Sequence, residues 1–211
     1  TQNQAFSAIL FLYREVLHIE LDGSINAMRA KRSKRKPVIL TREEVFPIIR
    51  LMEGEYKLMV QLLYGCGLRL NECLSLRVKE VDFGNGELMI LDPKGMKDRR
   101  VMLPKHLVDP LREQLGKTGK LHGRDLEEEH GYTTLPFALD RKYPGANREW
   151  KWQFIFPSSH LTPDPATGRL VRYHRHGSAL QKALRKVVIR SGVNKSVHCH
   201  TFRHTFATHL L

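Results

Sequence analysis

Two side chains near the carboxyl end of the sequence can act together on a phosphate. His200 and Arg203 stand three residues apart, so both can reach one point from the start of a helix. The unpaired backbone N–H groups at a helix start also favour an anion. Phe202, Phe206 and Leu210 recur at helical spacing and predict the helix that anchors this corner to a core.

Two further cations complete a set suited to phosphoryl transfer. Arg69 follows the glycine turn at residues 65–67 between two predicted helices, as either an ion-pair partner or an anion clamp. Lys94 stands beside a glycine in a predicted hairpin turn, where a solvated turn is the alternative. Two guanidinium groups can hold the non-bridging oxygens of a phosphodiester. Lys94 can protonate a leaving 5′ oxygen and His200 can shuttle a proton, without a metal or cofactor.

The histidines allow a metal site as an alternative. Several of them crowd the last third of the chain, among them His174, His176, His198, His200, His204 and His209. His200 and His204 have the spacing of two ligands on one helical face. No acidic residue stands between them, and Arg203 alongside would oppose a divalent cation. We therefore expect no metal.

Composition indicates a partner rich in phosphate. Lysine and arginine number 35 against 22 acidic residues, which gives a net charge of +13. Such an excess favours nucleic acid, and a merely solvated basic surface is the alternative. Three cysteines without a paired pattern indicate reduced thiols in a cytosolic setting. The sequence has neither the roughly 20 apolar residues of a membrane span nor a signal peptide pattern.

The chain begins with one predicted amphipathic helix, over residues 5–17, and continues with a basic run at residues 29–37. Such a run stays extended and suits a linker along a phosphate backbone, with a solvated linker as the alternative. Its cations are Arg29, Lys31, Arg32, Lys34, Arg35 and Lys36.

The remaining chain reads as mainly helical with a small hairpin. Thr41 and Glu44 form a capping box for a first helix, a second helix ends at Gly65, and Asn71 can cap a short third one. Strands are predicted at 87–91, 99–103 and 154–156, and helices at 105–116, at 138–144 and from Ser178 to about Gly192. The fold class is α+β, mainly α-helical, with a small antiparallel sheet.

Both tryptophans lie within three residues and next to cations, at Trp150-Lys151-Trp152. Aromatic faces beside positive charge suit stacking on unpaired bases. Core packing is the alternative, and we expect it for one of the two rings.

Three segments together resemble the successive boxes of the tyrosine recombinases: Gly67–Glu72 (GLRLNE), Lys94–Arg99 (KGMKDR) and His200–His209 (HTFRHTFATH). The resemblance covers roughly residues 37–211. The stretch from Ala138 through Tyr143-Pro144 and Trp150–Gln153 to Phe156-Pro157 further resembles the insertion of integron integrases, which bind folded single-stranded sites with extrahelical bases.

The resemblance implies roles for particular residues. The catalytic group would be Arg69, Lys94, His200 and Arg203, with Trp152 stacking on an extruded base. Further DNA contacts would come from Lys31, Arg32, Lys34, Arg35, Lys36, Pro165, Tyr173 and His174. The protein would form a homo-oligomer on DNA in the bacterial cytoplasm, at the nucleoid and not at a membrane.

The resemblance also implies domains. Residues 1–28 would end an N-terminal domain, 29–37 would be the linker, and 38–211 the catalytic domain, with the insertion at about 117–157. The family's nucleophilic tyrosine follows the third box, whereas all six tyrosines here precede His200. We therefore expect a fragment, truncated at both ends, that binds DNA without cleaving it. The alternative is a non-catalytic DNA-binding module or regulator.

Overall fold

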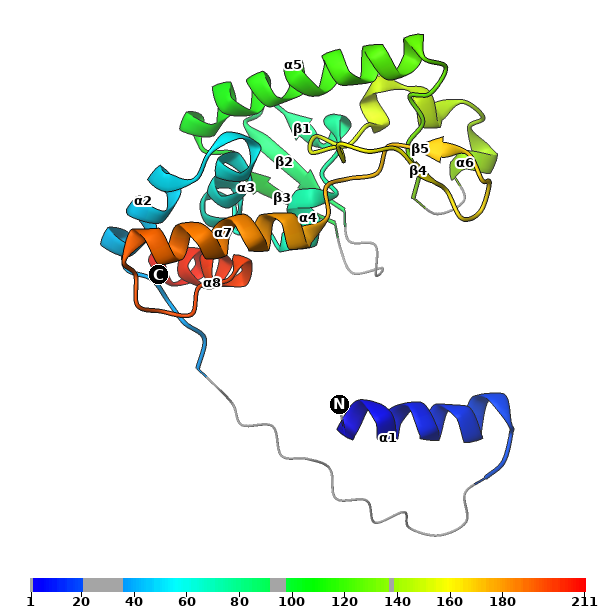
Figure 1. Cartoon of the computed structure of the whole chain (residues 1–211), viewed down its shortest axis with the longest axis horizontal. Helices are drawn as coiled ribbons and strands as arrows, with labels where there is room; N and C mark the ends of the chain where they lie inside the picture. Colours follow the sequence, from blue (N-terminus) through cyan, green and yellow to red (C-terminus); the bar gives the residue numbers. More distant parts are fainter. Residues whose placement is uncertain (1, 21–35, 92–97, 137–138) are drawn as a thin grey trace. The chain divides into compact units, whose positions relative to one another are not determined.

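The chain separates into two compact units, residues 1–36 and 37–211. The computed structural model describes residues 2–20, 36–91, 98–136 and 139–211. This part is mainly helical and carries small antiparallel sheets, which confirms the predicted fold class (Figure 1). Within these ranges, none of the helices combines the length and the apolar character that a membrane span requires.

The first unit contains the predicted helix. α1 spans Gln2–Phe11 and continues into a π-helical turn, η1, at Leu12–Val16. None of the residues of these two elements is buried. Lys36 is described and exposed. The other cations of the basic run, at positions 29, 31, 32, 34 and 35, lie outside the described residues.

The second unit begins with two helices that the sequence predicts correctly. α2 spans Arg42–Leu51, and Glu44 accepts the Thr41 N–H in a 2.8 Å hydrogen bond at its start. α3 spans Gly54–Gly65 and buries most of its apolar side chains. Because α3 contacts α2, α4, α5 and α8, it is the central helix of the unit.

The short helix α4 spans Leu70–Leu74, and its cap differs from the prediction. The capping residue is Arg69, so the assignment of Asn71 is wrong. Glu72 fixes the helix start at Arg69, because its carboxylate accepts the Arg69 N–H at 2.7 Å. The helix start therefore lies two residues earlier than the Asn71 pattern suggests.

A three-stranded antiparallel sheet, in the order β1-β2-β3, follows the 3₁₀ turn η2 (Val78–Glu80). β1 (Val81–Asp82) is an addition to the predicted hairpin of β2 (Glu87–Ile90) and β3 (Arg99–Met102). Leu88 and Ile90 face the core, whereas Arg100 is exposed. The hairpin turn, which includes Lys94, lies outside the described residues.

α5 spans Lys105–Glu127, so the predicted end at Gly116 is wrong. The apolar stripe of Leu107 and Leu111 continues at the same spacing in side chains that are polar but buried: Gln114, Thr118, His122 and Asp125. Apolar periodicity does not detect such a continuation. The first part of the predicted insertion is therefore the second half of this helix.

The predicted strand at residues 154–156 is buried but is not a strand. Phe154 forms only an isolated bridge with Arg77, and the Ile155 N–H donates to Leu76. The Ile155 carbonyl accepts from the side chains of Gln114 and Thr118, at 3.0 and 2.9 Å. The polar stripe of α5 thus provides hydrogen bonds that a neighbouring strand would otherwise supply.

The rest of the segment between α5 and α7 has short elements. α6 spans Leu139–Lys142, as predicted, followed by the 3₁₀ turns η3 (Ala146–Arg148) and η4 (Trp150–Trp152). A small hairpin of β4 (Thr162–Pro163) and β5 (Leu170–Val171) lies in the predicted loop. After it, Arg172 donates to Asp125 of α5 at 2.6 Å in a buried ion pair that fixes this segment.

The last two helices are α7, Gly177–Ser191, and α8, Cys199–His209. The cap of α7 is His176, whose Nδ1 accepts the Ser178 N–H, so the prediction of Ser178 as the cap is wrong. α8 is anchored by Phe202, which is fully buried, but Leu210 is 70% exposed and does not anchor it. Cys199 and Thr205 complete the buried face.

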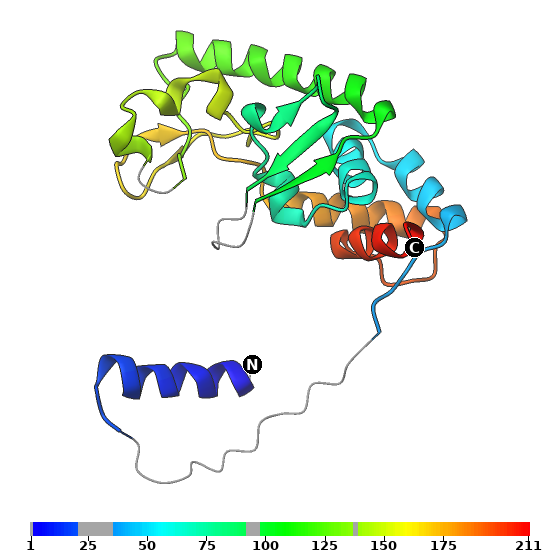
Figure 2. The ribbon, with the colours of Figure 1, turned by 180° about the vertical axis from the view of Figure 1, so that it is seen from behind.

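Several helices of the second unit lie together at one end of it. In Figure 1, α2, α3, α7 and α8 lie together, the three-stranded sheet follows, and α6 with the β4-β5 hairpin lies at the other end. Figure 2 shows the same order from behind, with α5 lying along one edge of the unit, above the sheet. Direct contacts of α2 with α7, and of α3 with α8 and α5, support this arrangement.

Gly67 should be the glycine least tolerant of substitution near α8. Its φ is +61°, and an added Cβ would overlap the ring of Phe206. We expect Gly67→Ala to lower the free energy of unfolding by about 3 kcal/mol, from the backbone cost plus overpacking. Denaturant unfolding measures this.

Gly86→Ala is the matched control, because Gly86 has φ +66° but no atom within 4 Å of the added Cβ. Gly86→Ala should lower the free energy of unfolding by only about 1–2 kcal/mol, the cost of a positive φ at a residue with a Cβ. Equal losses in the two variants would show that the contact with Phe206 does not matter.

Candidate active site

Arg69 is positioned by the turn between α3 and α4. Its N–H and its Nη1 both donate to Glu72, at 2.7 and 2.6 Å. These two bonds fix the backbone and one side of the guanidinium group, while the Arg69 side chain remains 51% exposed. The other side of the group is therefore available to a ligand.

Arg99 reaches the same carboxylate from strand β3. Its Nη1 donates to Oε1 of Glu72 at 2.9 Å, and its Nη2 donates to Oε2 at 2.6 Å. This two-pronged arrangement is the strongest geometry between an arginine and a carboxylate. It places the base of the β2-β3 hairpin beside Arg69.

Arg203 is the third guanidinium group at this point, and α8 supplies it. Its Nη1 donates to the carbonyl of Gly67 and lies 3.8 Å from Oε2 of Glu72. Phe202, the preceding residue, is fully buried and fixes the helix. The structure therefore brings together Arg69 and Arg203, which the sequence singles out from positions 134 residues apart.

The charges at this cluster do not cancel. Burial acts to raise the pKa of Glu72, but hydrogen bonds from Arg99 and Arg69 outweigh it and hold the pKa at about 2. Burial also lowers the pKa of Arg203, against the attraction of Glu72. Three guanidinium groups around one carboxylate leave an excess of positive charge with exposed N–H donors, which is suited to an oxyanion such as a phosphate.

His200 and Lys94 complete the predicted set only in part. His200 lies exposed in the first turn of α8, one helical turn before Arg203. Lys94 lies outside the described residues. Within the described ranges, no group of three or more His, Cys, Asp or Glu side chains could hold a metal ion.

A cavity of about 720 Å³ opens beside this cluster, and Glu72 lies in its wall. Phe154, Tyr173 and His174 form an aromatic group there, with ring centroids 4.1 to 5.4 Å apart. The Arg77 guanidinium group packs 4.1 Å from the centroid of the Phe154 ring. Two of the predicted DNA-binding residues, Tyr173 and His174, therefore share a cavity with Glu72.

His174 presents a defined hydrogen-bonding face. Its Nδ1 lies 2.9 Å from the carbonyl oxygen of Arg175, so Nδ1 carries the proton and donates. Burial lowers the pKa of His174, which favours the neutral ring. Its Nε2 is then an acceptor. Tyr173 beside it is 44% exposed, so a ring is available at the cavity rim.

The remaining predicted DNA-contacting residues differ in how exposed their side chains are. Trp152 is only 8% exposed, and the Lys79 ammonium group lies 3.6 Å from its ring centroid. Trp150 is 37% exposed and stacks on His122. In this conformation Trp150 offers more ring surface to a base than Trp152 does. Pro165 is exposed in the turn between β4 and β5.

Sequence reasoning assigned no role to two members of the cluster. Glu72 follows Arg69 by three residues, which is the spacing of a helix-capping partner and was the available signal. Arg99 lies in the second of the three motif segments, but its contact with Glu72 spans 27 residues. No local pattern reveals that contact.

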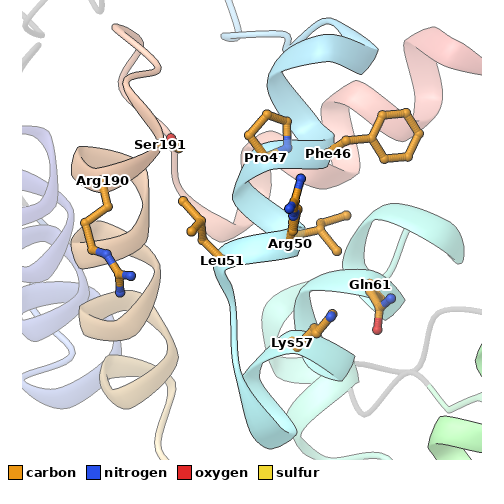
Figure 3. Close-up of a pocket in the computed structure, with 9 residues that line it drawn as sticks. Phe46, Pro47, Arg50, Leu51, Lys57, Gln61, Arg190 and Ser191 are labelled. Carbon is orange, nitrogen blue, oxygen red and sulfur yellow. The ribbon is translucent and has the colours of Figure 1, made fainter.

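A second hollow lies away from these residues, between α2, α3 and α7. It has a volume of about 720 Å³ and is mainly apolar, with Phe46, Pro47 and Leu51 in its wall and Arg50 and Arg190 at its sides (Figure 3). It contains none of the predicted site residues. The candidate chemistry is therefore on the side of the unit where Glu72 lies.

Known proteins resemble this chain over most of its length. A model of the phage integrase family matches residues 39–211. An integrase/recombinase from Escherichia coli is 41% identical over 211 residues, which is 100% of this chain and 63% of that protein. A tyrosine recombinase from Pseudothermotoga lettingae is 27% identical over 204 residues, covering 95% of this chain and 57% of that one.

The fold is also similar to that of solved structures. The XerH site-specific recombinase bound to its difH substrate, in a pre-cleavage complex, aligns with a TM-score of 0.57 at 21% identity. The alignment covers 97% of this chain and 52% of that one. At this identity the likeness concerns the fold alone. The chain spans less than two thirds of the length of each of these three proteins.

The charge of Glu72 should stabilise the fold in a pH-dependent way. Its pKa is lowered from 4.5 to about 2, so the stabilisation is complete above the unfolded value and is lost as the pH falls towards 2. We expect Glu72→Gln to reduce the free energy of unfolding by about 2–3 kcal/mol at pH 7. The loss should be smaller at pH 3, as measured by denaturant titration at both pH values.

Glu87→Gln serves as the control. Glu87 pairs with Arg100 at 3.5 Å on the exposed face of the same sheet, where an ion pair contributes little. A Glu72→Gln effect that was as small as this control, or that did not change with pH, would contradict the central role of Glu72.

Proposed function

Because the chain belongs to the phage integrase family, we propose that it is the greater part of a tyrosine recombinase, which cuts and rejoins DNA at specific sites. The observation that carries this proposal is the cluster of Arg69, Arg99 and Arg203 around Glu72. The exposed donors of Arg69 and Arg203 suit the scissile phosphate, and the net charge of +13 suits the DNA around it.

The reaction is a transfer of the phosphate between two oxygens. A tyrosine hydroxyl oxygen attacks phosphorus, and the bond from phosphorus to the 5′ oxygen of the DNA breaks. Arg69 and Arg203 bind the non-bridging oxygens and stabilise the charge of the five-coordinate transition state. Lys94 gives a proton to the leaving 5′ oxygen, and His200 holds or moves a proton on the attacking side. Attack by a 5′ hydroxyl on the phosphotyrosine rejoins the strand.

The nucleophile, in this proposal, comes from a part of a longer protein beyond residue 211. All six tyrosines of the sequence precede His200. Three of them, Tyr56, Tyr64 and Tyr132, lie in or beside packed elements, and Tyr64 is hydrogen-bonded to His209 at 2.9 Å. The 211-residue chain alone would bind DNA and form no covalent adduct.

We further propose a role for each part of the chain. Residues 1–28, which include α1, end an N-terminal DNA-clamping domain, and residues 29–37 follow the phosphate backbone. Residues 38–211 form the catalytic domain. Copies of the protein assemble on DNA, in the bacterial cytoplasm at the nucleoid. The exposed apolar side chains of α1, such as Ile9 and Phe11, support the first assignment, because a lone helix cannot bury its own stripe.

A finer proposal is that the DNA site is of the integron type, a folded strand with extrahelical bases. The cavity beside Glu72 supports it, since Tyr173 offers a ring for stacking and His174 offers an acceptor. Trp150 or Trp152, and Pro165, would contact a second unpaired base. The alternative is a non-catalytic DNA-binding module of the same fold, which the exposed basic groups support equally well.

Removing Arg203 should separate cleavage from binding. In the longer protein with its nucleophile, we expect Arg203→Ala to reduce covalent adduct formation by about 100- to 1,000-fold, as for other lost oxyanion donors. DNA affinity should change only slightly, because many other cations remain. Gel analysis of the adduct and equilibrium binding measure the two effects.

Arg190→Ala is the control for charge alone, since Arg190 is exposed in the hollow of Figure 3, away from the cluster. Its adduct formation should stay near that of the unsubstituted protein. If Arg203→Ala lost binding and cleavage equally, the catalytic assignment would fail and the DNA-binding module would be favoured.

Tyr173 should discriminate between folded and duplex DNA. We expect Tyr173→Ala to weaken binding to a hairpin with extrahelical bases by about 5- to 100-fold, the value of one base stack. Binding to the matching duplex should change little, at each of several salt concentrations. Tyr143→Ala is the control, because Tyr143 is similarly exposed, at 49%, but lies outside the cavity. Equal effects on both DNA forms would refute the integron-type site.

A further inference from the structure

We propose that Arg99 is a positioning residue, which keeps Arg69 and Arg203 available to the scissile phosphate by binding both oxygens of Glu72. The inference rests on the function proposed above. It gives a role in the reaction to a residue that has no assigned part in the chemistry.

The position of Arg99 is fixed at both ends. Its backbone pairs with Ile90 in the register of β2 and β3. Its two terminal nitrogens donate to the two oxygens of Glu72, at 2.9 and 2.6 Å. The Glu72 side chain is only 9% exposed and that of Arg99 is 31% exposed, so water competes weakly for these bonds. Arg99 therefore acts on the phosphate through Glu72 and not by contact with it.

Glu72 is an internal competitor of the phosphate. Its carboxylate already accepts from Arg69 at 2.6 Å, and Arg203 is only 3.8 Å away. A phosphate needs the same N–H donors. If Arg99 were absent, the poorly solvated carboxylate would draw its compensation from the two remaining guanidinium groups. The guanidinium group of Arg203 would then be drawn towards the carboxylate of Glu72 and away from the phosphate.

The structure also indicates why this residue is an arginine. A planar guanidinium group matches the two carboxylate oxygens at once, whereas a lysine ammonium group is a single point of charge. A lysine at this position would neutralise Glu72 but would leave the orientation of the carboxylate free. The proposal therefore concerns both charge and geometry.

The test uses the longer protein with its nucleophile and compares Arg99→Met, Arg99→Lys and Arg100→Met. Arg100 is the neighbouring residue on β3, with a 69% exposed side chain and a loose 3.5 Å pair with Glu87. At saturating DNA, we expect Arg99→Met to slow covalent adduct formation by about 10- to 100-fold, as for a small misplacement of a reacting group. The Arg99→Lys variant should form the adduct more slowly by a smaller factor. The Arg100→Met variant should form it at the rate of the unsubstituted protein.

A double variant separates positioning from general damage to the fold. If Arg99 acts through Glu72, then adding Arg99→Met to Glu72→Gln should slow adduct formation no further than the slower single variant. Multiplied effects would overturn the proposal, as would an Arg99→Lys variant of full activity. No adduct in the unsubstituted protein would overturn the proposed function, whereas an unaltered rate in Arg99→Met would overturn only the role of Arg99.

Discussion

The carboxylate of Glu72 accepts hydrogen bonds from Arg69 and Arg99 and lies within 3.8 Å of Arg203. These guanidinium groups come from a turn, a strand and a helix. They would repel one another without an anion between them, and the buried carboxylate would be costly without them. Each charge therefore depends on the others. The elements that carry them, α4, β3 and α8, must be held in place for any of these contacts to form.

The fold holds these elements in place through close contacts that leave no room for larger side chains. Gly67 has a positive φ and lies against the ring of Phe206, which brings the turn before α4 directly onto α8. On the far side of the unit, the polar stripe of α5 provides hydrogen bonds to Ile155 and a buried ion pair to Arg172. Those contacts fix the segment that carries Tyr173 and His174. The charge cluster and the aromatic cavity are thus held by contacts within the same unit.

Sequence reasoning identified the local features of this protein well. It located α2, α3, α7, α8 and the β2-β3 hairpin from periodicity and capping, and it singled out Arg69 and Arg203, which the structure brings together. It failed where distant residues decide the outcome. Gln114 and Thr118 extend α5 because they bind Ile155, and the same bonds explain why residues 154–156 need no partner strand. Glu72 and Arg99 meet across 27 residues, so no local spacing could pair them.

The most direct measurement concerns the charge that Arg69 and Arg203 are proposed to bind. A methyl group in place of one non-bridging oxygen removes the negative charge of the scissile phosphate. In the proposed longer protein, cleavage at this neutral linkage should depend far less on Arg69 and Arg203 than cleavage of normal DNA does, because the transition state carries one negative charge fewer. If alanine at either position slowed cleavage of both DNA forms by the same factor, the phosphate clamp would be contradicted.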